Sequence, residues 1–259
     1  MPLPFELAVD PATLAILALV AFVAGFIDAV AGGGGLLTIP ALLTAGLPPH
    51  LVLGTNKLSS TFGAATASYT FYRRKLFMPA QWRNALLGTA IGAFAGAAIA
   101  QWLPAEWLNQ MLPAVVFACG LYLLFGRTPA APLDPDAAIP RYRQWPQSLS
   151  LGFYDGVAGP GTGAFWTVSS LLLYPLDLVR ASGVARSMNF VSNACALSIF
   201  IISGQVAWVL GLCMGMALTV GAFLGARTAI KGGSKFIRPV FIMVVLALTA
   251  RLAWQHWFS

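Results

Sequence analysis

Four charged residues stand inside long apolar stretches of the sequence. Asp28 and Asp155 are the only carboxylates within such stretches, and Lys57 and Arg186 lie about two turns inside theirs. Ionisable side chains at membrane depth are costly and usually mark an ion, proton or substrate pathway. The carboxylates would take up and release protons, and the cations would neutralise a bound anion from two sides. Each pair also has a structural interpretation: carboxylates that accept backbone N–H bonds, and cations that extend to the membrane surface.

Both carboxylates stand beside glycine-rich interruptions of an apolar run. The first interruption reads GFIDAVAGGGGLLTIP over residues 25–40, and the second reads GFYDGVAGPGTG over residues 152–163. Non-helical backbone at membrane depth persists only when it is buried in protein or lines a wet cavity. Paired broken segments therefore predict an internal repeat with a transporter's binding site between its halves. The matched positions are Gly25, Phe26, Asp28, Val30, Ala31, Gly32 and Gly34 with Gly152, Phe153, Asp155, Val157, Ala158, Gly159 and Gly161.

The glycines themselves predict an anion site. Short helices that begin near Gly34 and Gly161 would point free N–H groups and the positive end of the helix dipole at a shared anion. A Cβ atom would block the approach of an oxyanion to the backbone. Close helix packing is the alternative, but four consecutive glycines exceed what such packing needs. The predicted substrate-binding residues are Gly32, Gly33, Gly34, Gly35, Thr55, Asn56, Lys57, Ser60, Gly159, Gly161, Thr162, Gly163, Arg186, Asn189 and Asn193, with Asp28 and Asp155 as proton-coupling or structural residues.

The composition indicates an integral membrane protein. Hydrophobic residues make up 58% of the chain and charged residues 9%, which is far from the usual composition of a soluble domain. The apolar runs are long and rich in Leu, Ala and Gly, which favours a helical bundle over an outer-membrane barrel. The net charge of +7 comes from basic residues at the ends of apolar runs, so it indicates membrane topology and not a nucleic-acid partner. The three cysteines are expected to be small packing residues, and no metal or cofactor is expected.

The runs define two similar halves. We predict a first repeat over residues 1–126, a cytoplasmic linker over 127–145 and a second repeat over 146–259, in one integrated membrane domain. Each repeat would hold a glycine-broken or re-entrant element and about three full transmembrane helices, in an all-α fold. The expected elements are a broken element over 13–45, helices over 51–72, 86–103 and 108–125, a second broken element over 148–174, helices over 178–203 and 206–226, a basic turn over 227–238 and a helix over 241–257.

Each repeat crosses the membrane an odd number of times, so the two repeats are expected to have inverted topology. This arrangement places twelve of the fifteen Lys and Arg residues on the cytoplasmic side, as the positive-inside rule requires. The N-terminus of this multi-pass membrane protein would then lie on the side opposite the cytoplasm. The Gly88-xxx-Gly92 and Gly211-xxx-Gly215 stripes would serve a homodimer or packing within the chain equally well.

The sequence resembles the TauE/SafE sulfite-exporter family, also called TSUP, along nearly its whole length. The resemblance rests on GFIDAVAGGGGLLTIPALL (25–43), TNKL (55–58), YRRK (72–75), GFYDGVAGPGTG (152–163), MNFVSN (188–193), FLGAR (223–227) and IRP (237–239). The resemblance implies a bacterial inner-membrane secondary carrier of sulfur-containing or organic anions, such as sulfite, sulfonates or sulfoacetate.

These observations together predict a secondary transporter that exports small anions, with proton coupling as one interpretation of the carboxylates. An anion channel of the same fold is the alternative. No enzymatic activity is expected, because the sequence offers no evident pairing of a nucleophile with a base and no metal cluster. The expected partners are a small anionic substrate and the lipid bilayer.

Overall fold

The computed structural model describes residues 10–104, 107 and 140–258, and for residues 238 and 241–258 it describes the backbone alone. The helix predicted over residues 108–125 therefore lies outside the described residues. All the elements in the described part of the chain are helices, as predicted. They are α1 (Pro11–Ala31), α2 (Gly34–Thr44), α3 (Pro49–Arg73), α4 (Arg83–Ala100), α6 (Arg141–Val157), α7 (Thr162–Leu173), α8 (Leu178–Ile202) and α9 (Trp208–Phe258).

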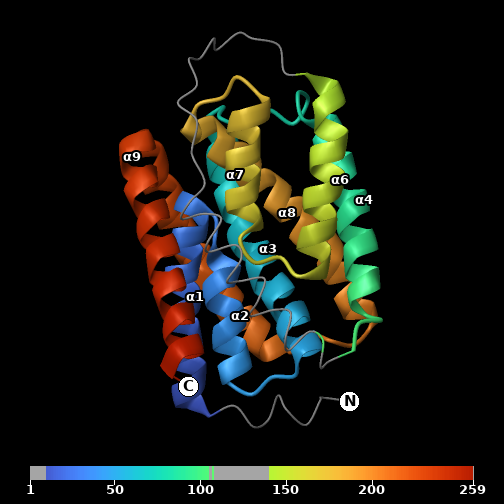
Figure 1. Cartoon of the computed structure of the whole chain (residues 1–259), viewed down its shortest axis with the longest axis vertical. Helices are drawn as coiled ribbons and strands as arrows, with labels where there is room; N and C mark the ends of the chain where they lie inside the picture. Colours follow the sequence, from blue (N-terminus) through green and yellow to red (C-terminus); the bar gives the residue numbers. More distant parts are fainter. Residues whose placement is uncertain (1–9, 105–106, 108–139, 259) are drawn as a thin grey trace.

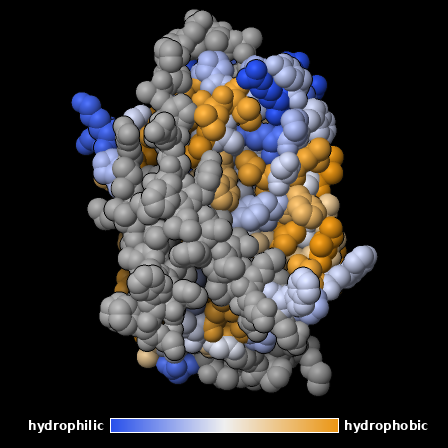
Figure 2. All heavy atoms as spheres, viewed as in Figure 1, coloured by the Kyte–Doolittle hydropathy of each residue, from blue (hydrophilic) through white to orange (hydrophobic). Residues whose placement is uncertain are grey.

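Several of these helices have the length and composition of membrane spans. Helices α1, α4, α8 and the segment Trp208–Ile237 of α9 are long and apolar enough to cross a membrane. On the face shown in Figure 2, strongly hydrophilic residues gather near the two ends of the molecule, and hydrophobic residues cover much of the flank between them. The described chain is thus an all-helical membrane protein.

Helix α1 begins and ends with defined caps. The Asp10 carboxylate accepts hydrogen bonds from the backbone N–H groups of Ala12 and Thr13, at 2.9 Å each. The Thr13 hydroxyl also donates to it at 2.6 Å, and this bond is the main reason why the pKa of Asp10 is lowered. At the other end Gly32 adopts a left-handed conformation with φ of 80°, which L side chains rarely adopt. The sequence thereby fixes both ends of this span.

Helix α9 continues through a segment that was expected to be a turn. The basic segment over 227–238 was expected to form a turn, but the backbone stays helical on both sides of a single break at Gly233, where φ is 58° and ψ is −158°. Glycine tolerates this conformation at little cost, so one residue divides α9 into two arms. The second arm runs along one edge of the molecule and ends near the level at which α1 begins (Figure 1).

Glycines let two pairs of helices pack at close range. A Cβ atom on Gly92 of α4 would lie 2.5 Å from the Leu149 carbonyl oxygen of α6, and one on Gly225 of α9 would strike the Phe26 carbonyl of α1. Such contacts allow backbones to approach closely. They hold α4 beside α6 and α1 beside α9 (Figure 1). Both glycine stripes that would serve a dimer make contacts inside the chain, with Ser148, Leu149, Leu58 and Phe62.

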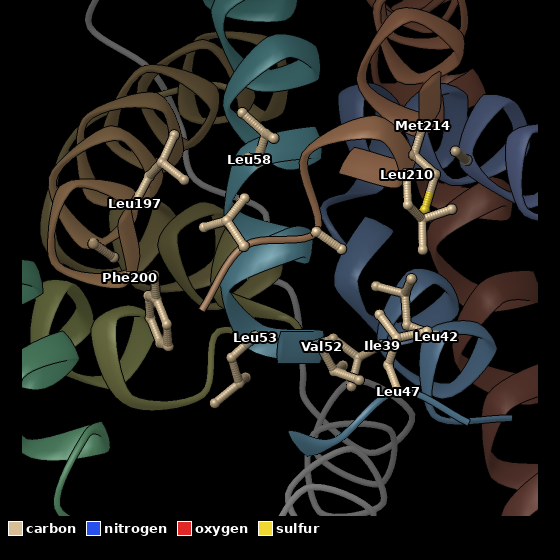
Figure 3. Close-up of a cluster of buried hydrophobic side chains, with 14 of the residues drawn as sticks. Ile39, Leu42, Leu47, Val52, Leu53, Leu58, Leu197, Phe200, Leu210 and Met214 are labelled. Carbon is tan, nitrogen blue, oxygen red and sulfur yellow. The ribbon is translucent and has the colours of Figure 1, made fainter. Parts of the chain in front are cut away.

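A cluster of buried aliphatic side chains locks α2 against its neighbours. Ile39 and Leu42 of α2 lie beside Val52 of α3 (Figure 3), and Leu53 of α3 and Leu210 near the start of α9 belong to the same cluster. Phe200 and Leu197 of α8 extend the same cluster. The short helix α2 is too short to span a membrane, so this packing is what sets its position. Its N-terminus is thereby held near the middle of the molecule.

Candidate substrate site

The two glycine-rich breaks meet near the middle of the molecule. Helix α2 begins at Gly34 after the N-cap Gly33, and α7 begins at Thr162 after Gly161, which has φ of 76°. From mid-height α2 and α7 run towards opposite ends of the molecule (Figure 1). A Cβ atom on Gly35 would lie 3.5 Å from the Cα atom of Pro160, so the two tips are in contact. Two helix N-termini therefore converge on one region, which favours negative charge there.

Asp28 closes the first break. Its Oδ1 atom accepts hydrogen bonds from the backbone N–H groups of Gly33 at 3.2 Å and Gly34 at 3.0 Å. These are donors that α2 cannot satisfy within its own first turn. Asp28 thus acts as a cap on α2 although it lies in the last turn of α1.

The repeat mate, Asp155, has different partners. Its Oδ1 atom lies 2.7 Å from the Lys57 Nζ atom, and Lys57 also donates to the Asp155 carbonyl oxygen. The Ser192 hydroxyl donates to Oδ2 of the same carboxylate. Lys57 is 1% exposed and Asp155 is 2% exposed, so this ion pair is shielded from water. A buried charge is tolerable only when it is paired in this way.

Arg186 forms the corresponding contact with the first half. Its NH1 atom donates to the Asp28 carbonyl oxygen and lies 3.6 Å from the Asp28 carboxylate. Its NH2 atom donates to the Gly163 carbonyl oxygen at 3.2 Å. The Arg186 Nε atom and the Asn189 Oδ1 atom are buried without a hydrogen-bond partner. Arg186 is fully buried, so this centre retains one unused donor and one unused acceptor.

The glycines make room for the two cations. A Cβ atom on Gly159 would lie 2.8 Å from the Lys57 Nζ atom, and one on Gly32 would lie 2.5 Å from the Arg186 NH2 atom. Gly163 is equally confined, because its Cβ position is 2.9 Å from the same NH2 atom. Both Gly32 and Gly159 also have positive φ angles. Each break therefore needs glycine for its backbone conformation and for the approach of a cationic side chain.

Of the neutral residues predicted for the site, some bind groups at the two breaks and others bind backbone elsewhere. Asn56 lies at the centre, where its Oδ1 atom accepts from the Thr38 hydroxyl at 2.6 Å and, at 3.5 Å, from Ser60. Thr162 donates to the Gly159 carbonyl oxygen at 2.7 Å. Thr55 instead accepts from the backbone N–H of Ala207, in the connection that leads into α9. Asn193 donates to the carbonyl oxygen of Asn189, one turn earlier in its own helix.

Two residues at the site were not among the predicted site residues. Thr38 and Ser192 supply hydroxyl donors to Asn56 and to Asp155, respectively. Small hydroxyl residues are common in membrane helices, so neither stood out by type. The signal that finds them is position: Ser192 follows Asn189 by one turn on the polar face of α8.

Comparison with known proteins places the chain in a family. The family model described as sulfite exporter TauE/SafE matches residues 17–252. The protein belongs to the TauE/SafE sulfite-exporter family. It is therefore a member of a membrane transporter family, as the resemblance in its sequence predicted. Among the described residues, no group of three or more His, Cys, Asp or Glu side chains is placed to hold a metal ion.

Named relatives within the TauE/SafE family are similar over nearly the whole chain. A "Probable membrane transporter protein" of Haemophilus influenzae is 39% identical over 95% of this chain and 96% of its own length. "Probable membrane transporter protein ORF9" of a Sinorhizobium species is 39% identical over 92% of both chains. "Probable membrane transporter protein YfcA" of Escherichia coli K12 is 36% identical over 97% of this chain and 96% of its own. No solved structure matches the chain.

Proposed function

We propose that this protein is a secondary carrier that exports small sulfur-containing or organic anions, such as sulfite or sulfonates, across the bacterial inner membrane. The observation that carries the proposal is that Lys57 and Arg186 are buried against the two glycine tips, where two helix N-termini converge. Fixed positive groups of this kind are what an anion requires at membrane depth. The description of the family as sulfite exporters supports the substrate class.

The proposed carrier has two inverted halves that move about the central site. The contacts between the halves support this arrangement, because they recur at matched positions. Lys57 contacts Asp155, and its mate Arg186 contacts Asp28. Gly54 packs against the Gln205 carbonyl oxygen, and its mate Gly183 packs against that of Leu76. Halves related in this way exchange roles when one side of the site opens and the other closes.

The orientation that we propose places the N-terminus in the periplasm. Gln144 near the start of α6 donates to the Gln81 carbonyl oxygen, so α6 begins beside the basic connection after α3. Arg73 and Arg227 line one pocket, which puts the basic segment of α9 at the same end. The start of α1 lies at the other end, where Leu17 packs in one cluster with Leu210 near the start of α9. The positive-inside rule makes the basic end cytoplasmic.

Proton coupling is proposed to act through Asp155. An anion cannot use the charge of Lys57 while the Asp155 carboxylate occupies it at 2.7 Å. Protonation of Asp155 removes the competing negative charge and leaves Lys57 to the anion. The proton and the anion would thus bind together. Asp28 is less suited to this task, because its carboxylate is committed to two N–H groups of the first break.

This coupling has a consequence for direction. The empty site holds Lys57 with an ionised Asp155, and the loaded site holds Lys57 with a neutral Asp155 and a monovalent anion. Both forms carry the same net charge, so a full cycle moves no net charge. Proton and anion travel the same way, and export requires an anion gradient that exceeds the opposing proton gradient.

An anion channel of the same fold is the alternative. A channel needs a continuous polar path, whereas the Lys57–Asp155 ion pair is closed to solvent, with Lys57 at 1% and Asp155 at 2% exposure. This closure favours a carrier that opens to one side at a time. Accelerated exchange of labelled anion by unlabelled anion on the opposite side would support the carrier, and single-channel currents would contradict it.

The experiment that tests the proposal is anion binding to the purified protein. The panel contains sulfite, sulfate, thiosulfate, sulfoacetate, taurine and a small carboxylate. Each is measured with the wild type, with Lys57→Ala and Arg186→Ala, and with Arg83→Ala as a control that removes an exposed cation. We expect saturable binding of at least one anion, weakened by the two buried substitutions alone. Binding that ignores both buried cations would overturn the proposal.

A further inference from the structure

A second, separate collection of cations lies between α3 and α9. A cavity of about 830 Å³ is lined there by ten described residues, of which four are basic. The basic residues are Arg73 and Arg74 at the end of α3, and Arg227 and Lys231 in α9. No ion pair between described residues includes any of the four. Their positive charge is therefore not balanced by the described protein.

The cavity lies on the outer face of the bundle, away from the central site. Its α3 residues, Ala65, Tyr69 and Arg73, repeat at intervals of four, so they share one face of the helix. Lys57 and Ala64 are buried on another face of the same helix. Tyr69 is 60% exposed, and Phe223 on α9 is 40% exposed. In a protein that spans a membrane, such an outer face meets lipid.

The lining changes in character along the two helices. The cations lie towards the end of α3 and in the matching part of α9, whereas Ala65 and Phe223, earlier in each helix, supply an apolar wall. Two cations are held over aromatic rings: the Arg73 guanidinium is 5.9 Å from the Tyr69 ring centre, and that of Arg227 is 4.4 Å from the Phe223 ring centre. These contacts position the guanidinium groups at the boundary between apolar and polar lining.

We propose that this cavity is a binding site for an anionic phospholipid. The four cations match a phosphate-containing headgroup, and the apolar wall matches the start of its acyl chains. Basic pockets between transmembrane helices bind anionic headgroups in just this position along the membrane normal. A free phosphate ion would use the cations but would leave the apolar wall without a partner. The proposal is independent of the substrate that the central site carries.

The test measures lipid retention by the full-length protein purified in detergent. The probes are phosphatidylglycerol and phosphatidylcholine, titrated separately and followed by native mass spectrometry. The test variant is Arg74→Gln with Lys231→Gln, and the control is Lys235→Gln, which removes one exposed cation beyond the break at Gly233. A basic residue at an anionic surface contributes roughly a fivefold effect, so the double variant should bind phosphatidylglycerol about 25-fold more weakly.

The expected results separate a built site from general electrostatic attraction. The control residue does not line the cavity, so its substitution should change phosphatidylglycerol binding by less than about twofold. Phosphatidylcholine should bind weakly to every form. A further variant, Arg74→Lys with Arg227→Lys, keeps the charges and should retain most of the binding. Equal loss in the control variant would overturn the proposal. So would displacement of the lipid by millimolar inorganic phosphate, which would identify a site for the free ion.

Discussion

Lys57 of the first half forms its ion pair with Asp155 of the second half, at 2.7 Å, and not with a residue of its own half. The repeat mates, Arg186 and Asp28, are joined across the halves in the same sense. Each half therefore supplies the cation that neutralises the other half's carboxylate. This exchange ties the two helix breaks together at the centre of the molecule.

The pairing predicts unequal costs for single and double substitutions. Lys57→Met leaves the Asp155 carboxylate buried without its cation, which typically costs about 3–5 kcal/mol. Lys57→Met combined with Asp155→Asn removes both charges and should cost clearly less than the sum of the two single changes. Thermal unfolding of the purified variants measures these differences. Additive costs would mean that the ion pair does not couple the two residues.

The two carboxylates should respond differently to amide substitution. Asp28→Asn keeps an oxygen that can accept from Gly33 and Gly34, and the backbone carbonyl that accepts from Arg186 is unchanged, so transport should keep its pH dependence even if its rate falls. Asp155→Asn removes the group that competes for Lys57, so transport should lose its pH dependence. Initial rates in proteoliposomes over a pH series distinguish these outcomes. If the transport rate of Asp155→Asn still depends on pH, another group must carry the proton.

Gly32 should tolerate substitution far less than a matched glycine elsewhere. Gly32→Ala places a Cβ atom 2.5 Å from the backbone N atom of Ala164, at a residue with positive φ. Gly46 has a similar φ of 85° but open space around its Cβ position, so Gly46→Ala should cost only about 1–2 kcal/mol of backbone strain. The yield of folded protein and its unfolding temperature compare the two. Equal yields and unfolding temperatures for the two variants would show that the backbone around Gly32 can shift to accommodate a methyl group.

The cap on α1 should make its stability depend on pH. The folded pKa of Asp10 is lowered, chiefly by the hydrogen bond from the Thr13 side chain. The contribution of the cap is therefore present above the unfolded pKa and is lost as the pH falls through the folded pKa. Wild type should exceed Asp10→Ala in unfolding temperature near neutral pH, and the gap should close in acid. A gap that does not change with pH would assign the effect to packing.

The two glycine-rich helix breaks could be predicted from the sequence, because they depend on the residues at the breaks themselves. Four consecutive glycines at 32–35 and the matched segment at 159–163 disfavour continuous helix, so the end of α1 and the starts of α2 and α7 could be placed within a few residues. Helix α6 instead begins at Arg141, inside the stretch that was expected to be the linker. Polar stripes likewise identified α3 and α8. Local rules failed over 227–238, where a basic, glycine-containing stretch was expected to turn. Only Gly233 leaves the helix there, because the cations are compatible with a helix that reaches the membrane surface.

The sequence could predict that the buried charges pair, but not which carboxylate pairs with which cation. Two carboxylates and two cations in apolar runs imply pairing, because an unpaired buried charge is costly. Which carboxylate meets which cation depends on how the halves pack, and that information is not local. The same reason explains Thr55, whose place in the polar stripe suggested the site but whose hydroxyl caps the connection before α9 through Ala207.

The most direct test of the account is proton movement during transport of a sulfonate, whose headgroup does not itself titrate near neutral pH. Proteoliposomes that contain a pH-sensitive dye would receive an inward gradient of the sulfonate, with wild type and Asp155→Asn compared side by side. Coupling through Asp155 predicts about one proton carried inward with each monovalent anion by the wild type, and anion movement without proton movement in Asp155→Asn. Equal proton movement in both proteins, or anion flux in the wild type without protons, would contradict it.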